Sequence, residues 1–227
     1  MKKLTLSLLA AAIFLQSACV PMLKTATKLG VRKYDDLKEV NVSDYELKDA
    51  DGKMYRYSEL FKGKTVYLYT WFNANQLPPT DQKPTYAALR QRFDVYPDVA
   101  FAYLFTGPSI NEFNDFSKKH PEAKSFMLIK NDQTKAFLPS ENIHSKAQII
   151  GKDGTVLGYN GPGEDDNFLV DYALMKARDG QDAKKSAHRL IKSVNRDGVD
   201  SEELKTFYAK HFHKPADSTN FSIHFGN

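Results

Sequence analysis

Alternation of polar and apolar residues predicts two β-hairpins in this chain. Tyr45 and Leu47 alternate with charged neighbours, Asp51-Gly52 supplies a turn, and residues 54–57 return. A second hairpin is predicted at 147–159, again around an Asp-Gly turn. Two runs without any charged residue lie between the hairpins and are typical of strands that are buried on both faces. These runs are residues 65–72 and 99–105.

Helical periodicity separates the predicted strands. Apolar residues at i, i+3 and i+7 predict a helix over 81–93, and another helix is predicted after Ser109, whose side chain can cap it. The remaining predicted elements are a helical turn at 58–61, a short strand at 125–129 and a helix at 167–178. Strands that alternate with helices, with hairpins at both ends, predict an α/β three-layer domain.

Two amphipathic helices are predicted beyond this domain, at 181–196 and 201–212. Their apolar faces need a surface, which is either their own domain or a partner. Residues 221–225 alternate in polarity and predict an edge strand or a segment for a partner's sheet. The first helix has a basic face that fits either an anionic lipid or acidic partner, or a solvated surface of a packed helix. This candidate interaction face comprises Lys185, Arg189, Lys192 and Arg196.

Composition narrows the possible functions. The 227 residues include 32 basic and 28 acidic residues, and a net charge of +4 is too small to indicate nucleic-acid binding by itself, so we expect no nucleic-acid partner. One cysteine excludes an internal disulfide, a CxxC pair and a four-cysteine zinc site. We predict no cofactor and no metal site. Asp165-Asp166 fits a cation site or a solvated loop, and His211 with His213 would share one side only if that segment were extended.

The first nineteen residues suggest a role for the single cysteine. Two lysines precede an apolar run at 4–15 that is short for a permanent membrane span, and small residues precede Cys19. This pattern predicts a signal peptide over 1–18. The cleaved chain would carry 30 basic and 28 acidic residues, a net charge of about +2, and it would fold without disulfides.

The segment around Cys19 resembles the lipobox of bacterial lipoproteins, although that family prefers leucine where Gln16 stands. The resemblance implies that acyl chains such as palmitate are attached to Cys19, which becomes the first mature residue. Val20 is not the aspartate that retains lipoproteins in the inner membrane, so the resemblance implies the outer membrane, facing the periplasm. The alternative is a secreted protein with a free cysteine near its N-terminus.

Residues 44–178 resemble the thioredoxin-like family, in the branch shared by periplasmic thiol–disulfide oxidoreductases and peroxiredoxin-type proteins. The resemblance rests on the order of landmarks in YELKDADGKMYRYSELFKGKTVYLYTWF and in IIGKDGTVLGYNG. It implies a three-layer sandwich with a central mixed sheet over 44–178. A tether at 19–43 would precede this domain, and a C-terminal helical extension and tail would follow at 179–227.

The catalytic residues of that family do not carry over. The family places CxxC at the start of the helix after the tryptophan strand, where the helix N-terminus lowers the thiol pKa. Aligned on Pro84, the four positions 76–79 read Gln-Leu-Pro-Pro. Aligned on Trp71, the two cysteine positions fall on Asn75 and Pro78. The family's cis-proline would fall near His144-Ser145, and the chain has no proline there. The resemblance therefore implies a redox-inactive domain without catalytic residues.

A substituted site can still bind a ligand. Amide side chains donate and accept hydrogen bonds without ionising, which suits a peptide backbone or a polar ligand. The alternative is a loop whose polar side chains satisfy local backbone groups. The candidate ligand pocket comprises Trp71, Asn73, Asn75, Gln76, His144 and Ser145.

The sequence thus predicts a binding or docking module on an envelope lipoprotein, with a lipid anchor and an unidentified envelope protein as partners. Two alternatives stay open. One is the remnant of an oxidoreductase that acts on thiols or peroxides, and the other is a carrier of a small ligand or metal in the former active-site pocket.

Overall fold

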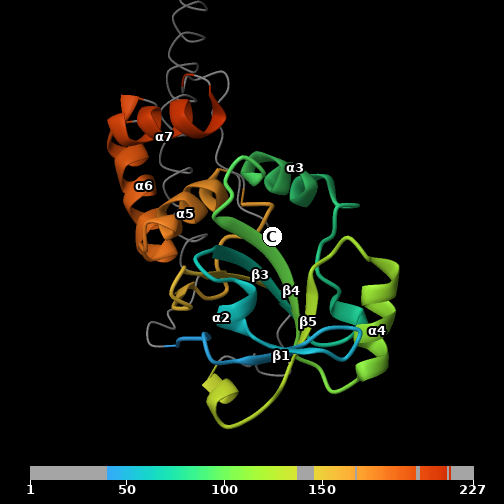
Figure 1. Ribbon diagram of the computed structural model, residues 1–227. Helices are drawn as coiled ribbons and strands as arrows, with labels where there is room; N and C mark the ends of the chain where they lie inside the picture. The colour runs from blue at the N-terminus through green and yellow to red at the C-terminus, as the bar shows by residue number, and fades with distance from the viewer. Residues whose placement is uncertain (1–39, 137–145, 167, 198–199, 214, 216–227) are drawn as a thin grey trace, which may run out of the picture.

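The computed structural model describes residues 40–136, 146–166, 168–197, 200–213 and 215. They form one sheet of seven strands in the order β2-β1-β5-β4-β3-β6-β7 (Figure 1). No helix in these ranges is long and apolar enough to cross a membrane. The strands are β1 (Glu46–Lys48), β2 (Met54–Arg56), β3 (Thr65–Trp71), β4 (Val99–Phe105), β5 (Ser125–Leu128), β6 (Lys146–Ile150) and β7 (Val156–Gly158).

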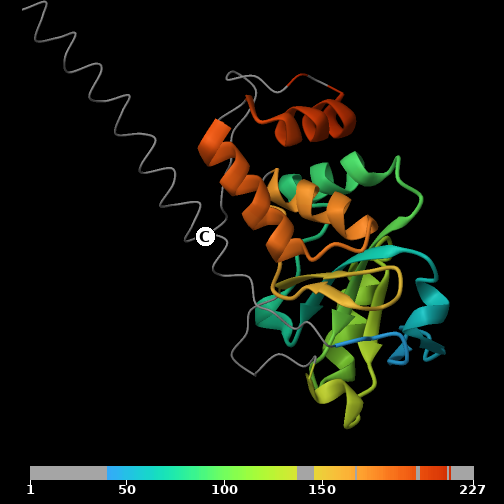
Figure 2. The ribbon, with the colours of Figure 1, turned by 90° about the vertical axis from the view of Figure 1, so that its left-hand side faces the viewer.

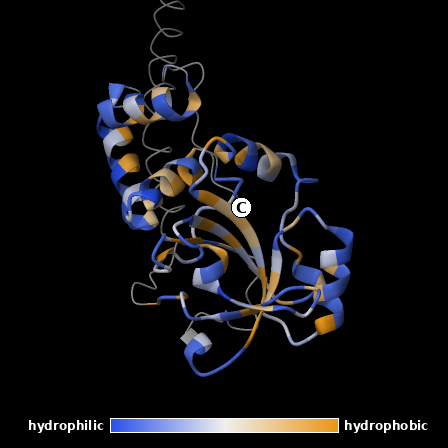
Figure 3. Cartoon of the chain, in the orientation of Figure 1, coloured by the Kyte–Doolittle hydropathy of each residue, from blue (hydrophilic) through white to orange (hydrophobic). Residues whose placement is uncertain are grey.

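Strands β3 and β4 form the centre of the sheet. They pair in parallel, β5 pairs in parallel with the other side of β4, and β6 lies antiparallel beside β3. The predicted hairpins close the two edges, β1 with β2 and β6 with β7. Every residue of β3 is buried, which explains the lack of charge in its sequence. Figure 3 shows the apolar residues concentrated along these central strands.

The sheet separates two apolar clusters. Tyr67 and Tyr69 of β3 belong to the cluster that contains α3, α4 and α5, whereas Val66 and Leu68 belong to the cluster that contains β1 and residues of α2. The sheet is therefore the middle layer, which confirms the predicted three-layer sandwich with a central mixed sheet. The helices of these layers are α2 (Tyr57–Leu60), α3 (Pro84–Phe93), α4 (Ile110–Lys119) and α5 (Leu169–Arg178).

The C-terminal extension folds onto this domain. Helices α6 (Ala183–Asp197) and α7 (Glu202–Phe212) bury their apolar faces in the same cluster as α5. Ser201 caps α7 by accepting a hydrogen bond from the backbone N–H of Leu204 at 3.3 Å. Both predicted amphipathic helices are confirmed, and the surface that covers their apolar faces is their own domain.

The first described residues are bound to the turn of the β6–β7 hairpin. The N–H of Val42 donates to the carbonyl of Gly154 at 2.9 Å. Gly154 has a φ of +84°, and a Cβ there would lie 2.2 Å from Ser43 Oγ. Glycine is required at this turn for both reasons. Several predicted features lie outside the described residues, namely the signal peptide, Cys19, nearly all of the tether, His144-Ser145 and the segment 221–225.

Candidate functional site

The segment between β3 and α3 is where the sequence resemblance predicts the redox site of thioredoxin-like proteins. It contains a short 3-10 helix, η1 (Ala74–Gln76), whose first turn is capped by Asn73: its side-chain oxygen accepts from the N–H of Asn75 at 3.0 Å. Helix α3 begins only at Pro84, with Lys83 at its N-cap position. Residues 76–79 therefore precede the helix by more than a turn. A thiol at these positions would therefore lie outside the first turn of α3, where the positive end of the helix dipole lowers a thiol pKa most.

The described members of the candidate ligand pocket have different roles. Trp71 is 1% exposed, and its ring packs against Phe105 and Phe116 at centroid distances of 4.3 and 4.9 Å. Among the described residues, its indole N–H and the side-chain oxygen of Gln76 have no hydrogen-bond partner. Asn75 is exposed. His144 and Ser145 lie outside the described residues, so this pocket stays a prediction.

The N-terminus of α3 contacts a carboxylate loop from the other end of the domain. This loop, residues 161–166, follows β7. Lys83 pairs with Glu164 at 2.5 Å and with Asp165, and Thr85 Oγ1 donates to Asp165 Oδ1 at 2.8 Å. Tyr69 donates its hydroxyl to Glu164, which is 6% exposed. The cation near Asp165 is thus a lysine of the same chain, separated by 82 positions, which local sequence spacing could not reveal.

Burial and pairing shift the proton affinities of this cluster. Burial lowers the pKa of Lys83, but hydrogen bonds to Asp165 and Glu164 outweigh it and hold the pKa above its ordinary value. Burial raises the pKa of Asp165, but the hydrogen bonds from Lys83 and Thr85 lower it by more, so the pKa lies below its ordinary value. Burial and the neighbouring Glu164 raise the pKa of Tyr69 well above its ordinary value. At neutral pH Lys83 is therefore charged, Asp165 is ionised and Tyr69 keeps its proton.

A second buried network joins α3, α5 and α7. Arg92 binds both oxygens of Asp171, at 2.6 and 2.8 Å, and the Nε2 atom of His211 lies 2.8 Å from the same carboxylate. The other ring nitrogen of His211 lies 3.1 Å from the hydroxyl of Tyr96. His211 is therefore engaged inside the molecule, whereas His213 is exposed. No group of three or more potential metal-ligating side chains occurs in the part of the chain that the structure describes.

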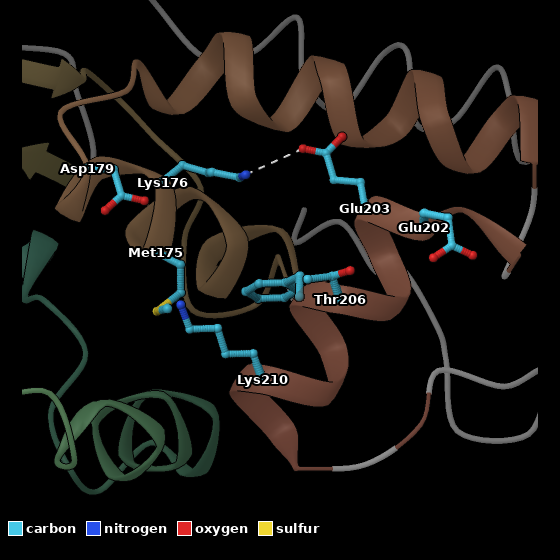
Figure 4. A pocket seen from close by; sticks show the side chains of 8 residues that line it. Met175, Lys176, Asp179, Glu202, Glu203, Thr206 and Lys210 are labelled. Carbon is cyan, nitrogen blue, oxygen red and sulfur yellow. Dashed lines mark ion pairs between the residues drawn. The ribbon is translucent and has the colours of Figure 1, made fainter.

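A cavity of about 370 Å³ lies between α5 and α7 (Figure 4). Lys176 reaches across it to Glu203 at 3.5 Å, and the hydroxyl of Tyr172 donates to the same carboxylate. Lys210 enters from the opposite end, over an apolar floor. Both signs of charge therefore line the cavity. Its lining residues are Met175, Lys176, Asp179, Glu202, Glu203, Thr206, Phe207 and Lys210.

Helix α6 places its basic residues on the outside of the molecule. Figure 2 views the molecule from the side on which this helix lies. All four cations of the predicted interaction face, Lys185, Arg189, Lys192 and Arg196, are exposed. The opposite face of the helix is buried. The surface is thus available to a partner, and its binding role remains a prediction.

No family model matches the chain, and no curated protein matches it. Solved structures do match it. A putative electron transport protein from Aquifex aeolicus is 13% identical, with a TM-score of 0.47 over 63% of this chain and 98% of that one. A putative thiol-disulfide oxidoreductase from Bacteroides vulgatus is 20% identical, with a TM-score of 0.44 over 58% and 93%. The exposed lipoprotein thioredoxin of Streptococcus pneumoniae is 19% identical, with a TM-score of 0.36 over 66% and 98%.

Proposed function

We propose that this chain, which has a thioredoxin-like fold without the thiols used by oxidoreductases of that fold, is a docking module anchored in the cell envelope. One observation carries the proposal. Neither alignment places a cysteine at the redox site of that fold. The helix that would activate a thiol begins at Pro84, and Lys83 and Thr85 at its start both bind Asp165. Disulfide exchange needs a thiolate, and residues 20–227 contain no cysteine that could form one.

The remaining features support a scaffold. Lys83 and Arg92, at the two ends of α3, both pair with buried carboxylates of the segment that leads into and forms α5. A helix fixed at both ends gives a rigid body on which a surface can be presented. The lipid on Cys19, cleavage of residues 1–18 and placement in the outer membrane facing the periplasm belong to the same proposal. Several acyl chains on one residue would anchor the protein stably.

The anchor is tested by replacing Cys19. In cells that make the full chain, we expect the wild-type protein in the membrane fraction and labelled by radioactive palmitate. Cys19→Ser should abolish the label and alter membrane fractionation. An unlabelled wild-type chain in the soluble fraction would contradict the anchor but would leave the docking role to be decided by the next experiment.

Docking is tested by site-specific photo-crosslinking in intact cells. A photoreactive residue replaces exposed Asn75 in the loop between β3 and α3, and exposed Lys118 on α4 serves as the matched control. We expect a discrete crosslinked product from position 75 and none of that size from position 118. In parallel, the purified protein should not reduce insulin or remove peroxide in the presence of dithiothreitol. Clear turnover in either assay would exclude the docking module as the main role.

The cavity between α5 and α7 favours a second candidate, a carrier of a small zwitterionic ligand. In the described residues, Lys210 and Asp179 line this cavity without an ion pair. A calorimetric titration with free amino acids, and with Zn²⁺ or Cu²⁺ as alternative cargo, tests this candidate. Heat that disappears in Lys210→Met would support an amino-acid carrier. No heat with any of these probes would remove the candidate.

A further inference from the structure

Helix α6 carries a narrow line of cations. At 100° per residue, Lys185, Arg189, Lys192 and Arg196 fall within about 60° of one another around the helix axis. From first to last they extend about 16 Å along it. Asp197, which pairs with Arg196 at 2.6 Å, is the helix's own acidic residue. The line therefore forms a straight, positively charged ridge, which we call the α6 ridge.

The body of the protein holds this ridge firmly. Ala183, Ala187 and Leu190 are 0% exposed on the opposite side of the helix, packed in the core with α5 and α7. An amphipathic helix that enters a membrane does so through its apolar face. In α6 that face is covered by the protein, so the ridge can contact a charged surface only from outside, through its cations.

Charge is distributed unevenly between α6 and the rest of the protein. Helix α6 contains five basic residues and one acidic residue, a net charge of +4. From residue 19 onward the chain has 30 basic and 28 acidic residues, so everything outside α6 sums to 25 basic and 27 acidic residues, or −2. An anionic surface attracts one side of such a molecule and repels the remainder, and this orients the molecule.

We propose that the α6 ridge rests on an anionic lipid surface and fixes the orientation of the anchored domain. The inference rests on the proposed function, because the anchor brings the domain to a membrane. Lipid is favoured over an acidic protein because the ridge is a straight row of long side chains on a convex helix. A flat layer of headgroups can meet Lys185, Arg189 and Lys192 at once, with Arg196, whose charge Asp197 partly offsets, at the end of the row. Each cation near such a surface contributes about fivefold to the binding constant.

Reactivity of the lysines tests this contact. The wild-type full chain, as cells produce it, is incorporated into vesicles of neutral phosphatidylcholine or of phosphatidylcholine with phosphatidylglycerol. An amine-acylating reagent is added, and mass spectrometry gives the acylation rate of each lysine. We expect Lys185 and Lys192 to react about fivefold or more slowly on anionic vesicles than on neutral ones. High salt should remove the difference, because it screens exposed charges. Lys62, in the turn after α2, and Lys118, on α4, are exposed internal controls and should react equally on both vesicles.

Two variants separate charge from structure. Arg189→Gln with Arg196→Gln removes two cations of the α6 ridge, and we expect the protection of Lys185 and Lys192 to fall several-fold. Arg189→Lys with Arg196→Lys keeps the charges and should keep the protection. Equal wild-type rates on neutral and anionic vesicles would overturn the proposal. Protection that occurs only in native membranes, and not on anionic vesicles, would assign the ridge to an acidic protein and also overturn it.

The proposed function can fail separately from this inference. If the protein does not remain bound to neutral vesicles, it has no lipid anchor, regardless of the acylation rates of its lysines. In that case the ridge is still tested by recruitment of the protein to anionic vesicles, which the double glutamine variant should weaken at least about tenfold and the double lysine variant should preserve. Lack of recruitment would overturn the inference.

Discussion

Glu164 and Asp171 are deeply buried carboxylates, and each is paired with a cation from one end of α3. Lys83 precedes the helix and Arg92 lies in its last turn. A buried charge without a partner costs several kcal/mol, so each of these contacts is difficult to break once formed. At the scale of single residues, α3 is therefore fixed at both of its ends by ion pairs with buried carboxylates.

Replacing Lys83 tests the first of these contacts. In Lys83→Met, Glu164 and Asp165 lose their cation, and we expect the free energy of unfolding to fall by about 2 kcal/mol, which allows for the 41% exposure of the lysine side chain. Chemical denaturation measures the loss. Arg90→Met, which removes the exposed pair with Asp81, is the control and should cost at most about 0.5 kcal/mol. Equal losses in the two variants would contradict the special role of Lys83.

Asp98 gives the fold a dependence on acidic pH. Burial raises the pKa of its carboxyl, but hydrogen bonds from Arg178 and Lys152 outweigh burial and lower the pKa to about 2. A carboxyl with a lowered pKa stabilises the fold above its ordinary pKa of 3.8, and the stabilisation is lost as the pH falls toward 2.

The prediction is therefore a pH-dependent effect of Asp98→Asn. Because the side chain is 25% exposed, we expect a loss of about 1 kcal/mol at pH 6, shrinking toward zero between pH 4 and about 2. Denaturation at a series of pH values measures it, with Asp115→Asn, an exposed residue of α4, as the control. A loss that stays constant down to pH 2 would show that the carboxylate charge is not its cause.

At the scale of elements, local sequence signals account for most of the fold. Asp-Gly turns located both hairpins, and Ser109 caps α4 as expected, accepting from the N–H of Glu112 at 3.3 Å. The apolar spacing predicts the start of α3 three residues early, because it gives no weight to Pro84 as a first helical residue. The contacts of Lys83, Arg92 and His211 with carboxylates join residues 40 to 82 positions apart. They depend on tertiary packing, and no spacing rule in a single sequence contains them.

The late start of α3 leads to a test by introduction of cysteines. In Gln76→Cys with Pro79→Cys, made with Cys19→Ser, both thiols lie ahead of the first turn of the helix. We expect thiol pKa values near the ordinary 8.5, measured by thiolate absorbance, and no insulin reduction. A second variant, Asn75→Cys with Pro78→Cys, places the cysteines where the alignment on Trp71 puts them. A thiol pKa below about 7 together with insulin reduction in either variant would contradict this expectation. It would show that restoring the cysteines is sufficient for redox activity.

For the whole molecule, the C-terminal extension and the sheet share one apolar core. Phe168, at the N-cap of α5, packs its ring against Phe207, Tyr208 and Phe212 of α7 at centroid distances of 5.2, 5.8 and 6.3 Å. Phe168 also has a φ of +70°, an unfavourable conformation for a bulky residue. Such a conformation persists only where surrounding contacts enforce it, and here α7 supplies many of them.

Truncation tests how far this shared core extends. A chain that ends at Arg178 lacks α6 and α7 and exposes the side of this region that packs on α7, including Phe168 and Tyr172, whose rings lie 5.2 and 5.1 Å from that of Phe207. Each large apolar side chain moved into water costs about 1.5–3 kcal/mol, and a typical domain has only about 5–15 kcal/mol in total. We therefore expect the shortened chain to lose cooperative thermal unfolding, whereas a chain that ends at Pro215 should retain it. If the chain ending at Arg178 unfolded with the midpoint of the longer one, α6 and α7 would be an attachment, and the α6 ridge would lack the rigid support on which its proposed orientation depends.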